Sequence, residues 1–218
     1  MIVQIYETQD AAEAARLAEA GVDHIGVLVG HGDFPREIPP ERARGIVAAA
    51  GSARTVALTL SADLDEIARV VEATDPDILH LGMPLEDVAP GDVQILKKQF
   101  PGVGIMRTIP VTDEGSVALA MTYEGIADYL LLDTQIQGQQ AIGATGRTHD
   151  WNLSRRIVEA VGIPVVLAGG LGPDNVVEAI GAVRPFGVDS KTRTDHDGGP
   201  FKDLEKVAAF AQSAKAAG

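Results

Sequence analysis

Hydrophobic and polar positions follow two alternating patterns along the chain. Short runs rich in β-branched residues are each followed by a longer Ala-rich stretch with amphipathic, helical spacing. The short runs predict eight strands, near residues 2–6, 24–29, 54–60, 77–81, 102–108, 127–133, 163–168 and 186–190. The longer stretches predict eight helices, over residues 10–20, 40–50, 63–73, 91–100, 113–125, 152–161, 173–182 and 201–214.

Several of the predicted strands are apolar almost throughout, as in residues 129–132 and 165–168. Strands of this composition are buried on both faces, as in a parallel sheet covered by helices. Eight strand–helix units of about 27 residues favour a single α/β domain over residues 1–218, folded as a (β/α)8 TIM barrel. The alternative is an open doubly wound sheet, but no Gly-rich dinucleotide-binding turn follows the first strand.

Charge and composition exclude several classes of partner and site. The chain has 18 Lys and Arg against 31 Asp and Glu, which gives a formal net charge of −13. This charge opposes binding to nucleic acid or to an anionic membrane surface. The absence of Cys excludes disulfides, thiolate metal sites and a Cys nucleophile.

Location and cofactors also follow from simple features of the chain. The N-terminal residues lack the basic segment of a signal peptide, and no apolar run approaches the roughly 20 residues of a membrane span. We therefore expect a cytoplasmic protein. The five His residues show no metal-ligand spacing, so we expect neither a metal ion nor another cofactor.

Candidate functional residues are those that end a strand or open the following loop, because a TIM barrel places its active site at the C-terminal ends of its strands. These residues are Tyr6, Glu7, His31, Asp33, Arg36, His80, Arg107, Asp133, Arg147, Asp189, Lys191 and Arg193. The cations among them would make the C-terminal end of the barrel positively charged in an otherwise acidic protein, which suits an anionic small molecule. The alternative is that they are ordinary solvated surface charges.

Three of these positions carry candidate acid–base groups. Asp133 ends the most apolar strand, where burial would raise its pKa into the range useful for proton transfer; it could instead cap the following loop. His80 faces either the barrel mouth or the core. Asp189 ends the last strand in the same way as Asp133 and is either catalytic or structural.

Paired glycines mark a candidate phosphate site. Within residues 167–175 an apolar strand turns through Gly169 and Gly170 into a helix. Glycines let backbone N–H groups approach an anion, and TIM barrels commonly hold phosphate with the loops after strands 7 and 8. The second loop would contribute Ser190, Lys191 and Thr192. A tight turn without a ligand is the alternative.

Three segments of the chain carry a family resemblance: residues 129–134, 143–151 and 164–176. In their order and spacing they resemble phosphoribosylanthranilate isomerase, a (β/α)8 enzyme of tryptophan biosynthesis, and residues 34–43 resemble the family's segment after strand 2. The resemblance implies an aldose–ketose isomerase acting on a phosphorylated substrate. It implies that Arg36 binds the aromatic carboxylate of the substrate and that Asp133 is the general acid that opens the sugar ring. Gly169 and Gly170 would bind the phosphate.

The chain departs from the family pattern at the base end of the site. The family's first strand ends in Lys-Ile-Cys-Gly, whose Cys is the general base, and here Tyr6 and Glu7 occupy the Cys and Gly positions. Tyr, with a pKa near ~10, is a poor base, and Glu7 would face a different direction from Tyr6 on a strand. His80 begins the segment that matches the family's Gln-Leu-His-Gly, and Lys191 begins the one that matches its Ser-Ser-Gly phosphate turn.

Two hypotheses remain. In the first, the chain is an enzyme with a changed substrate or reaction. Asp133 is then the acid, Glu7, His80 or Tyr6 the base, and Arg36, Arg107 and Arg147 contact an anionic phosphorylated substrate. A lyase or epimerase, with Lys191 as a Schiff-base nucleophile, belongs to the same class. In the second, the chain is a non-catalytic phosphometabolite-binding protein. Retention of Asp133 and of several cations favours the hypothesis that the chain is an enzyme. We expect it to act as a monomer or homodimer.

Overall fold

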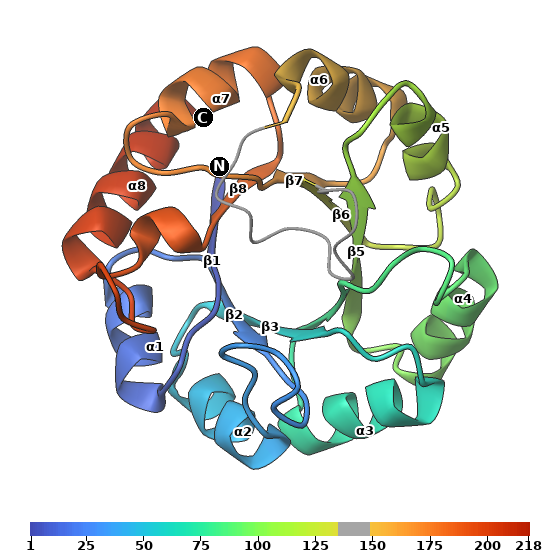
Figure 1. The fold of residues 1–218 in the computed structure, drawn as a ribbon, viewed down its shortest axis with the longest axis horizontal. Coiled ribbons are helices and arrows are strands. Elements are labelled where there is room, and N and C mark those ends of the chain that lie inside the picture. Colours follow the sequence, from blue (N-terminus) through green and yellow to red (C-terminus); the bar gives the residue numbers. More distant parts are fainter. Residues whose placement is uncertain (135–148) are drawn as a thin grey trace.

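The fold is a closed barrel of eight parallel strands (Figure 1). The computed structural model describes residues 1–134 and 149–218. The strands follow one another around the barrel in chain order, and β1 pairs with β8 to close it. They are β1 (Ile2–Ile5), β2 (His24–Leu28), β3 (Arg54–Thr59), β4 (Ile78–Leu81), β5 (Gly104–Pro110), β6 (Tyr129–Asp133), β7 (Val165–Leu167) and β8 (Gly187–Ser190). The predicted TIM barrel is confirmed, and the open sheet is excluded.

A helix follows each strand and covers the outside of the barrel (Figure 1). The helices are α1 (Ala11–Glu19), α2 (Pro40–Ala49), α3 (Leu64–Thr74), α4 (Pro90–Gln99), α5 (Gly115–Met121), α6 (Trp151–Ala160), α7 (Val176–Val183) and α8 (Leu204–Ala217), with a short 3-10 helix, η1 (Thr192–Thr194), before α8. In the described part of the chain, no helix is long and apolar enough to cross a membrane.

The core has two layers because each strand buries both faces. The larger layer lies between strands and helices and contains residues such as Leu17, Ile67 and Phe210. The smaller layer fills the inside of the barrel with Tyr6, Val56, Ile78, Met106, Leu131, Val166 and Ala168. Burial on both sides explains the nearly continuous apolar runs of the sequence.

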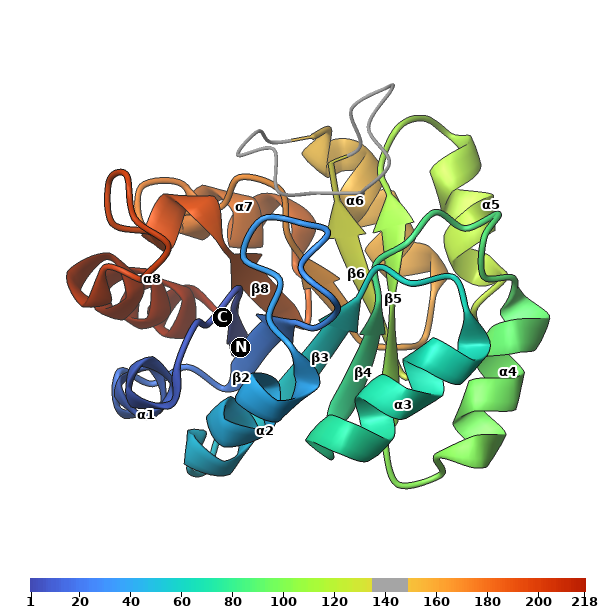
Figure 2. The same ribbon diagram turned by 60° about the horizontal axis from the view of Figure 1, so that its bottom comes forward.

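Parallel pairing brings the C-terminal ends of the strands to one end of the barrel, toward which the arrowheads of β5 and β6 point in Figure 2. Ile5 of β1 pairs with Ser190 of β8, and Pro110 of β5 pairs with Asp133 of β6. Asp133 therefore lies at the C-terminal rim, as the barrel predicts. The first strand ends at Ile5, one residue earlier than the sequence pattern suggests, so Tyr6 and Glu7 lie beyond it.

Aspartates begin four of the helices. The carboxylates of Asp10, Asp63, Asp150 and Asp203 each accept a hydrogen bond from a backbone N–H of the first turn. Such a cap satisfies a donor that the helix itself leaves without a partner.

The cap of α3 offers a direct test of this contribution. The Asp63 side chain accepts from the N–H groups of Asp65 and Glu66 at 2.9 and 3.2 Å. We expect Asp63→Ala to lower the free energy of unfolding by about 1 kcal/mol in denaturant titrations. Glu72→Ala, at an exposed position of the same helix, is the matched control and should change it by less than ~0.5 kcal/mol. Equal effects would show that the cap is not a source of stability.

Candidate active site

A cavity opens at the C-terminal ends of the strands, with about 580 Å³ of empty space that includes its open mouth. The predicted catalytic residues Tyr6, Glu7, His80 and Asp133 all line it, together with Lys191. The remaining lining residues are Leu28, Leu58, Leu60, Gly82, Thr108, Leu131 and Asp189. The fold thus brings together side chains from four parts of the chain that the sequence could only place at strand ends.

Tyr6 and His80 form a buried chain of hydrogen bonds with Thr108. The Tyr6 hydroxyl lies 2.7 Å from His80 Nδ1, and His80 Nε2 lies 2.6 Å from Thr108 Oγ1. Burial raises the pKa of Tyr6 well above its usual 10 and lowers the pKa of His80 to about 3. The phenol therefore keeps its proton, and both nitrogens of the neutral imidazole are already engaged.

A glycine on the neighbouring strand makes room for Tyr6. A Cβ atom at Gly26 of β2 would lie 2.2 Å from the Tyr6 ring, far inside van der Waals contact. The absence of a side chain at Gly26 is thus the local condition for a tyrosine at this point of the barrel interior.

Asp133 and Asp189 are acids with raised pKa values. Burial raises the pKa of Asp133 to about 7, although a hydrogen bond from the Thr134 N–H, 2.7 Å from Oδ1, and the nearby Lys191 both oppose the rise. Burial and repulsion from Asp133 raise the pKa of Asp189 to about 8, while Gln4 donates to it at 3.2 Å. The sequence-based expectation of a raised pKa at Asp133 is confirmed. Both groups can carry a proton near neutral pH.

Glu7 lines the cavity together with its chain neighbour Tyr6. Alternation of side chains holds only within a strand, and β1 ends at Ile5. The Glu7 carboxylate pairs with the Lys191 ammonium at 2.8 Å between Oε1 and Nζ. The other oxygen, Oε2, is buried and has no hydrogen-bond partner among the described residues.

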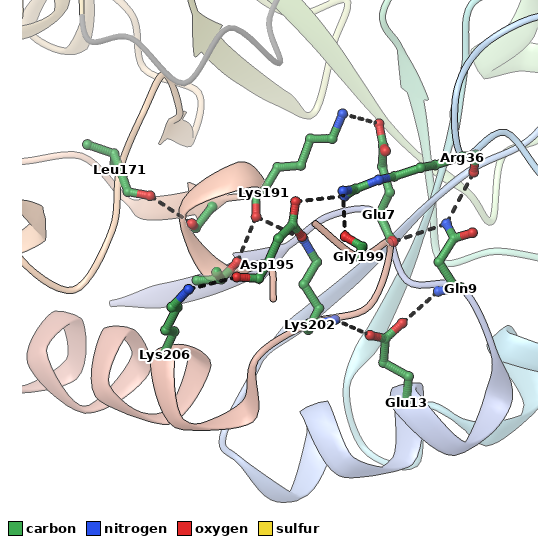
Figure 3. Close-up of polar contacts among 12 residues, drawn as sticks. Glu7, Gln9, Glu13, Arg36, Leu171, Lys191, Asp195, Gly199, Lys202 and Lys206 are labelled. Atoms are coloured by element: carbon green, nitrogen blue, oxygen red, sulfur yellow. Dashed lines mark hydrogen bonds and ion pairs between the residues drawn. The ribbon is translucent and has the colours of Figure 1, made fainter. Parts of the chain in front are cut away.

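Arg36 lies next to this cavity without lining it. Its guanidinium donates to Asp195 Oδ2 at 2.7 Å and to the carbonyl of Gly199 at 3.1 Å (Figure 3). The same carboxylate accepts from Lys202 Nζ at 2.5 Å, and the Lys202 side chain is fully buried. Sequence reasoning did not find Asp195 or Lys202, since no local pattern distinguishes them from other charged loop residues.

These contacts continue into a network that ties three loops together (Figure 3). Lys202 Nζ also donates to the carbonyl of Lys191 at 2.9 Å. On the other side, Gln9 Nε2 lies 3.2 Å from the carbonyls of both Glu7 and Arg36. The loops after β1, β2 and β8 are therefore connected by buried polar contacts around the Glu7–Lys191 pair.

Arg107 supports a loop, contrary to the prediction that it contacts a substrate. It is fully buried, and NH1 donates to the carbonyls of Leu81 and Met83 at 2.7 and 2.8 Å, while NH2 donates to Pro84 at 3.1 Å. A desolvated guanidinium needs such acceptors, and the loop after β4 supplies them. Arg147, the third predicted substrate contact, lies outside the described residues.

The paired glycines after β7 form a turn at the position where the sequence predicts a phosphate-binding site. Gly169 and Gly170 have φ values of 83° and 65°, in the left-handed region that favours glycine. The turn touches the one after β8, because Ser190 Oγ donates to the carbonyl of Leu171 at 2.7 Å. Within the described residues, the N–H groups of Gly170, Leu171 and Thr192 donate to no acceptor.

Comparison with known proteins places this architecture in a family. The model of the N-(5'phosphoribosyl)anthranilate (PRA) isomerase family matches residues 3–213. The chain belongs to this family. It is 39% identical over 217 residues to the N-(5'-phosphoribosyl)anthranilate isomerase of Haloferax volcanii, covering 99% of this chain and 93% of that protein.

Solved structures agree with the family assignment. The N-(5'-phosphoribosyl)anthranilate isomerase of Pyrococcus furiosus superposes with a TM-score of 0.81 at 27% identity, over 99% of both chains. A phosphoribosyl anthranilate isomerase in complex with reduced 1-(o-carboxyphenylamino)-1-deoxyribulose 5-phosphate superposes with a TM-score of 0.77 at 25% identity, over 99% of this chain and 100% of that one. The family resemblance inferred from three sequence segments is confirmed.

The raised pKa values of Asp133 and Asp189 predict how stability depends on pH. The folded protein binds these two protons more tightly than the unfolded chain, so its stability falls as pH rises toward about 8. The buried histidines, His24, His80 and His149, have lowered pKa values and act in the opposite direction, but only below about pH 6.5.

We therefore expect the free energy of unfolding to fall by on the order of 1 kcal/mol between about pH 6.5 and pH 8.5. Denaturant titrations at several pH values measure this slope. The double substitution Asp133→Asn/Asp189→Asn should remove most of it, whereas Asp65→Asn at an exposed position should not. An unchanged slope in the double variant would mean that these two groups are not the source.

Proposed function

We propose that this chain is an aldose–ketose isomerase acting on a phosphorylated sugar or sugar-like substrate, with Asp133 as its general acid. The observation that carries the proposal is the Asp133 carboxyl, which lies in the cavity at the end of β6 with its pKa raised to about 7. An acid with this pKa holds a proton at neutral pH and releases it readily, which is the optimum for general acid catalysis.

The reaction needs one group that gives a proton and one that takes one. Protonation of the sugar ring oxygen by Asp133 breaks the bond between that oxygen and the anomeric carbon. A base then removes the proton from the adjacent carbon, so that the electron pair forms a carbon–carbon double bond to the anomeric carbon. The resulting enol becomes the ketose when its hydroxyl loses a proton and the anomeric carbon gains one. The leucines on the cavity wall limit the access of bulk water to these proton transfers.

The turns after β7 and β8 are the proposed phosphate site. The N–H groups of Gly170, Leu171 and Thr192 supply donors on two adjoining turns, and Lys191 adds positive charge beside them. A dianionic phosphate matches donors of this kind. Gly169 has no room for a side chain, because a Cβ atom would lie 2.8 Å from both His149 Nδ1 and Thr134 Oγ1.

Two alternatives are disfavoured by particular contacts. A purely binding protein does not need a carboxyl with a pKa near neutral pH in its cavity, as Asp133 has. A Schiff-base mechanism needs the Lys191 amine free to attack a carbonyl carbon, but that group is paired with the Glu7 carboxylate at 2.8 Å. We further propose that the protein is cytoplasmic, that it acts as a monomer or homodimer and that it uses no cofactor.

Phosphate recognition is tested at Gly170, whose φ of 65° and position on the turn disfavour any side chain. We expect Gly170→Val to weaken binding of phosphorylated sugars by at least about tenfold, because the β-branched side chain blocks approach to the backbone donors. Isothermal titration with ribose 5-phosphate measures the effect, and Gly102→Val, where a Cβ meets no atom within 4 Å, is the control. Equal binding of ribose and ribose 5-phosphate by the unmodified protein would contradict the phosphate site.

The departures from the family pattern predict weak activity toward N-(5'-phosphoribosyl)anthranilate itself. Tyr6 replaces the Cys base, and a base contributes roughly 10²–10⁴-fold to rate. Arg36, which the family resemblance assigns to the substrate carboxylate, is paired with Asp195. Turnover near ~10 s⁻¹, ordinary for an enzyme, would overturn this prediction.

Reversion toward the family pattern is the matching experiment. We expect Tyr6→Cys alone to raise turnover less than the combined reversion of Tyr6→Cys, Glu7→Gly, His80→Gln and Lys191→Ser. The single change leaves His80 without its hydroxyl partner, whereas the combined change removes both new pairs together.

A further inference from the structure

Four of the departures from the family pattern meet in the structure as two contacting pairs. Tyr6 contacts His80 at 2.7 Å, and Glu7 contacts Lys191 at 2.8 Å. All four side chains line one cavity. A change at only one member of either pair would leave a buried polar group without its partner, which costs about 1–3 kcal/mol or more for a charge. The base end of the site has therefore been rebuilt as matched pairs.

The first pair supplies no base. His80 uses both ring nitrogens, one toward Tyr6 and one toward Thr108. The Tyr6 phenol is desolvated beside carboxylates, and its pKa is raised because burial and the negative charges of Asp189 and Glu7 oppose ionisation. Tyr6 and His80 form a rigid, neutral wall.

The second pair has the features of a base. Glu7 is 5% exposed, and its Oε1 lies 2.8 Å from the Lys191 ammonium, which holds the carboxylate in place. Oε2 has a free lone pair, since it meets no hydrogen-bond partner in the described part of the chain. A buried, ionised oxygen without a donor is a costly arrangement unless a substrate proton completes it.

The other carboxyls of the cavity are less suited to this task. Asp133 is the proposed acid and must hold a proton before the reaction begins. Burial and repulsion from Asp133 raise the pKa of Asp189 to about 8, although the hydrogen bond that Gln4 donates opposes the rise, so Asp189 too favours its protonated form near neutral pH. Of the carboxyls that line the cavity, only Glu7 has a cation at ion-pair distance among the described residues.

We infer that Glu7 is the general base of this enzyme and that Lys191 is its positioning residue. The inference rests on the proposed isomerase function. Glu7 Oε2 takes the proton from the carbon next to the anomeric carbon; the carbon–hydrogen bond breaks, an oxygen–hydrogen bond forms, and the electron pair enters the new double bond. Lys191, anchored by its carbonyl to the buried Lys202, fixes the direction of the carboxylate.

An affinity label tests the assignment without knowledge of the natural substrate. The probe is bromohydroxyacetone phosphate, a phosphorylated α-bromoketone whose carbon–bromine bond is displaced by a carboxylate oxygen, releasing bromide and forming an ester. The chain has no Cys, so no thiol competes for the label. Peptide mass spectrometry should find the ester on Glu7, and inorganic phosphate should protect it.

Three variants sharpen the test. Glu7→Gln should abolish the phosphate-protected label, and Glu7→Asp, whose carboxylate is one methylene short, should reduce it. Glu86→Gln, an exposed carboxylate on the loop after β4, should leave it unchanged. With any substrate that the unmodified enzyme converts, Glu7→Gln should lower kcat by about 10²–10⁴-fold and change KM much less.

The outcomes separate this inference from the proposed function. Binding of inorganic phosphate, followed by its ³¹P NMR signal, tests the phosphate site independently of the label. If phosphate binds and the protected label is an ester on Asp133 or Asp189, an N-alkyl adduct on His80 or Lys191, or absent from every residue, the assignment of Glu7 is wrong while the proposed function stands. If phosphate does not bind at all, the proposed function fails first.

Discussion

The arrangement of the loops at the C-terminal end of the barrel depends on one constraint: charged side chains are buried there, and each needs a partner of opposite charge or a hydrogen-bond acceptor. An isolated buried ion costs several kcal/mol, so each one needs a partner. Lys202, with a side chain that has no exposed surface, is held by Asp195 and by the Lys191 carbonyl. Asp195 in turn pairs with Arg36. The partners come from loops that follow different strands, so the conformation of each loop depends on the charges of the others.

The same constraint divides the carboxyls of the cavity into two kinds. Asp133 and Asp189 have no ion-pair partner among the described residues, and desolvation raises their pKa values to about 7 and about 8. Glu7 pairs with Lys191 at 2.8 Å, and its Oε2 has no hydrogen-bond partner among the described residues. A single cavity therefore holds two carboxyls with raised pKa values beside a third carboxyl that is paired with a lysine.

The family relationship gives these groups their context. The barrel, the acid at the end of β6 and the glycine turn after β7 follow the family pattern, whereas the groups after β1, β4 and β8 depart from it. A TIM barrel permits such a change because its loops carry the chemistry and its strands carry the stability. The departures contact one another as Tyr6 with His80 and Glu7 with Lys191, which is the expected result when a site is remodelled while its buried groups stay satisfied.

The sequence by itself determined the barrel, its element order and the position of Asp133, because period, apolar runs and strand ends are local properties of the chain. The same reasoning identified the glycine turn, since Gly169 and Gly170 need no distant partner to show their role. Only the tertiary structure decided the contacts that give the site its chemistry. Arg107 was predicted to contact substrate, and in the structure it donates to one carbonyl at the end of β4 and to two in the following loop. Lys202 gave no local signal at all. Partners far apart in the chain, and the desolvation that shifts pKa values, exist only after the barrel has closed.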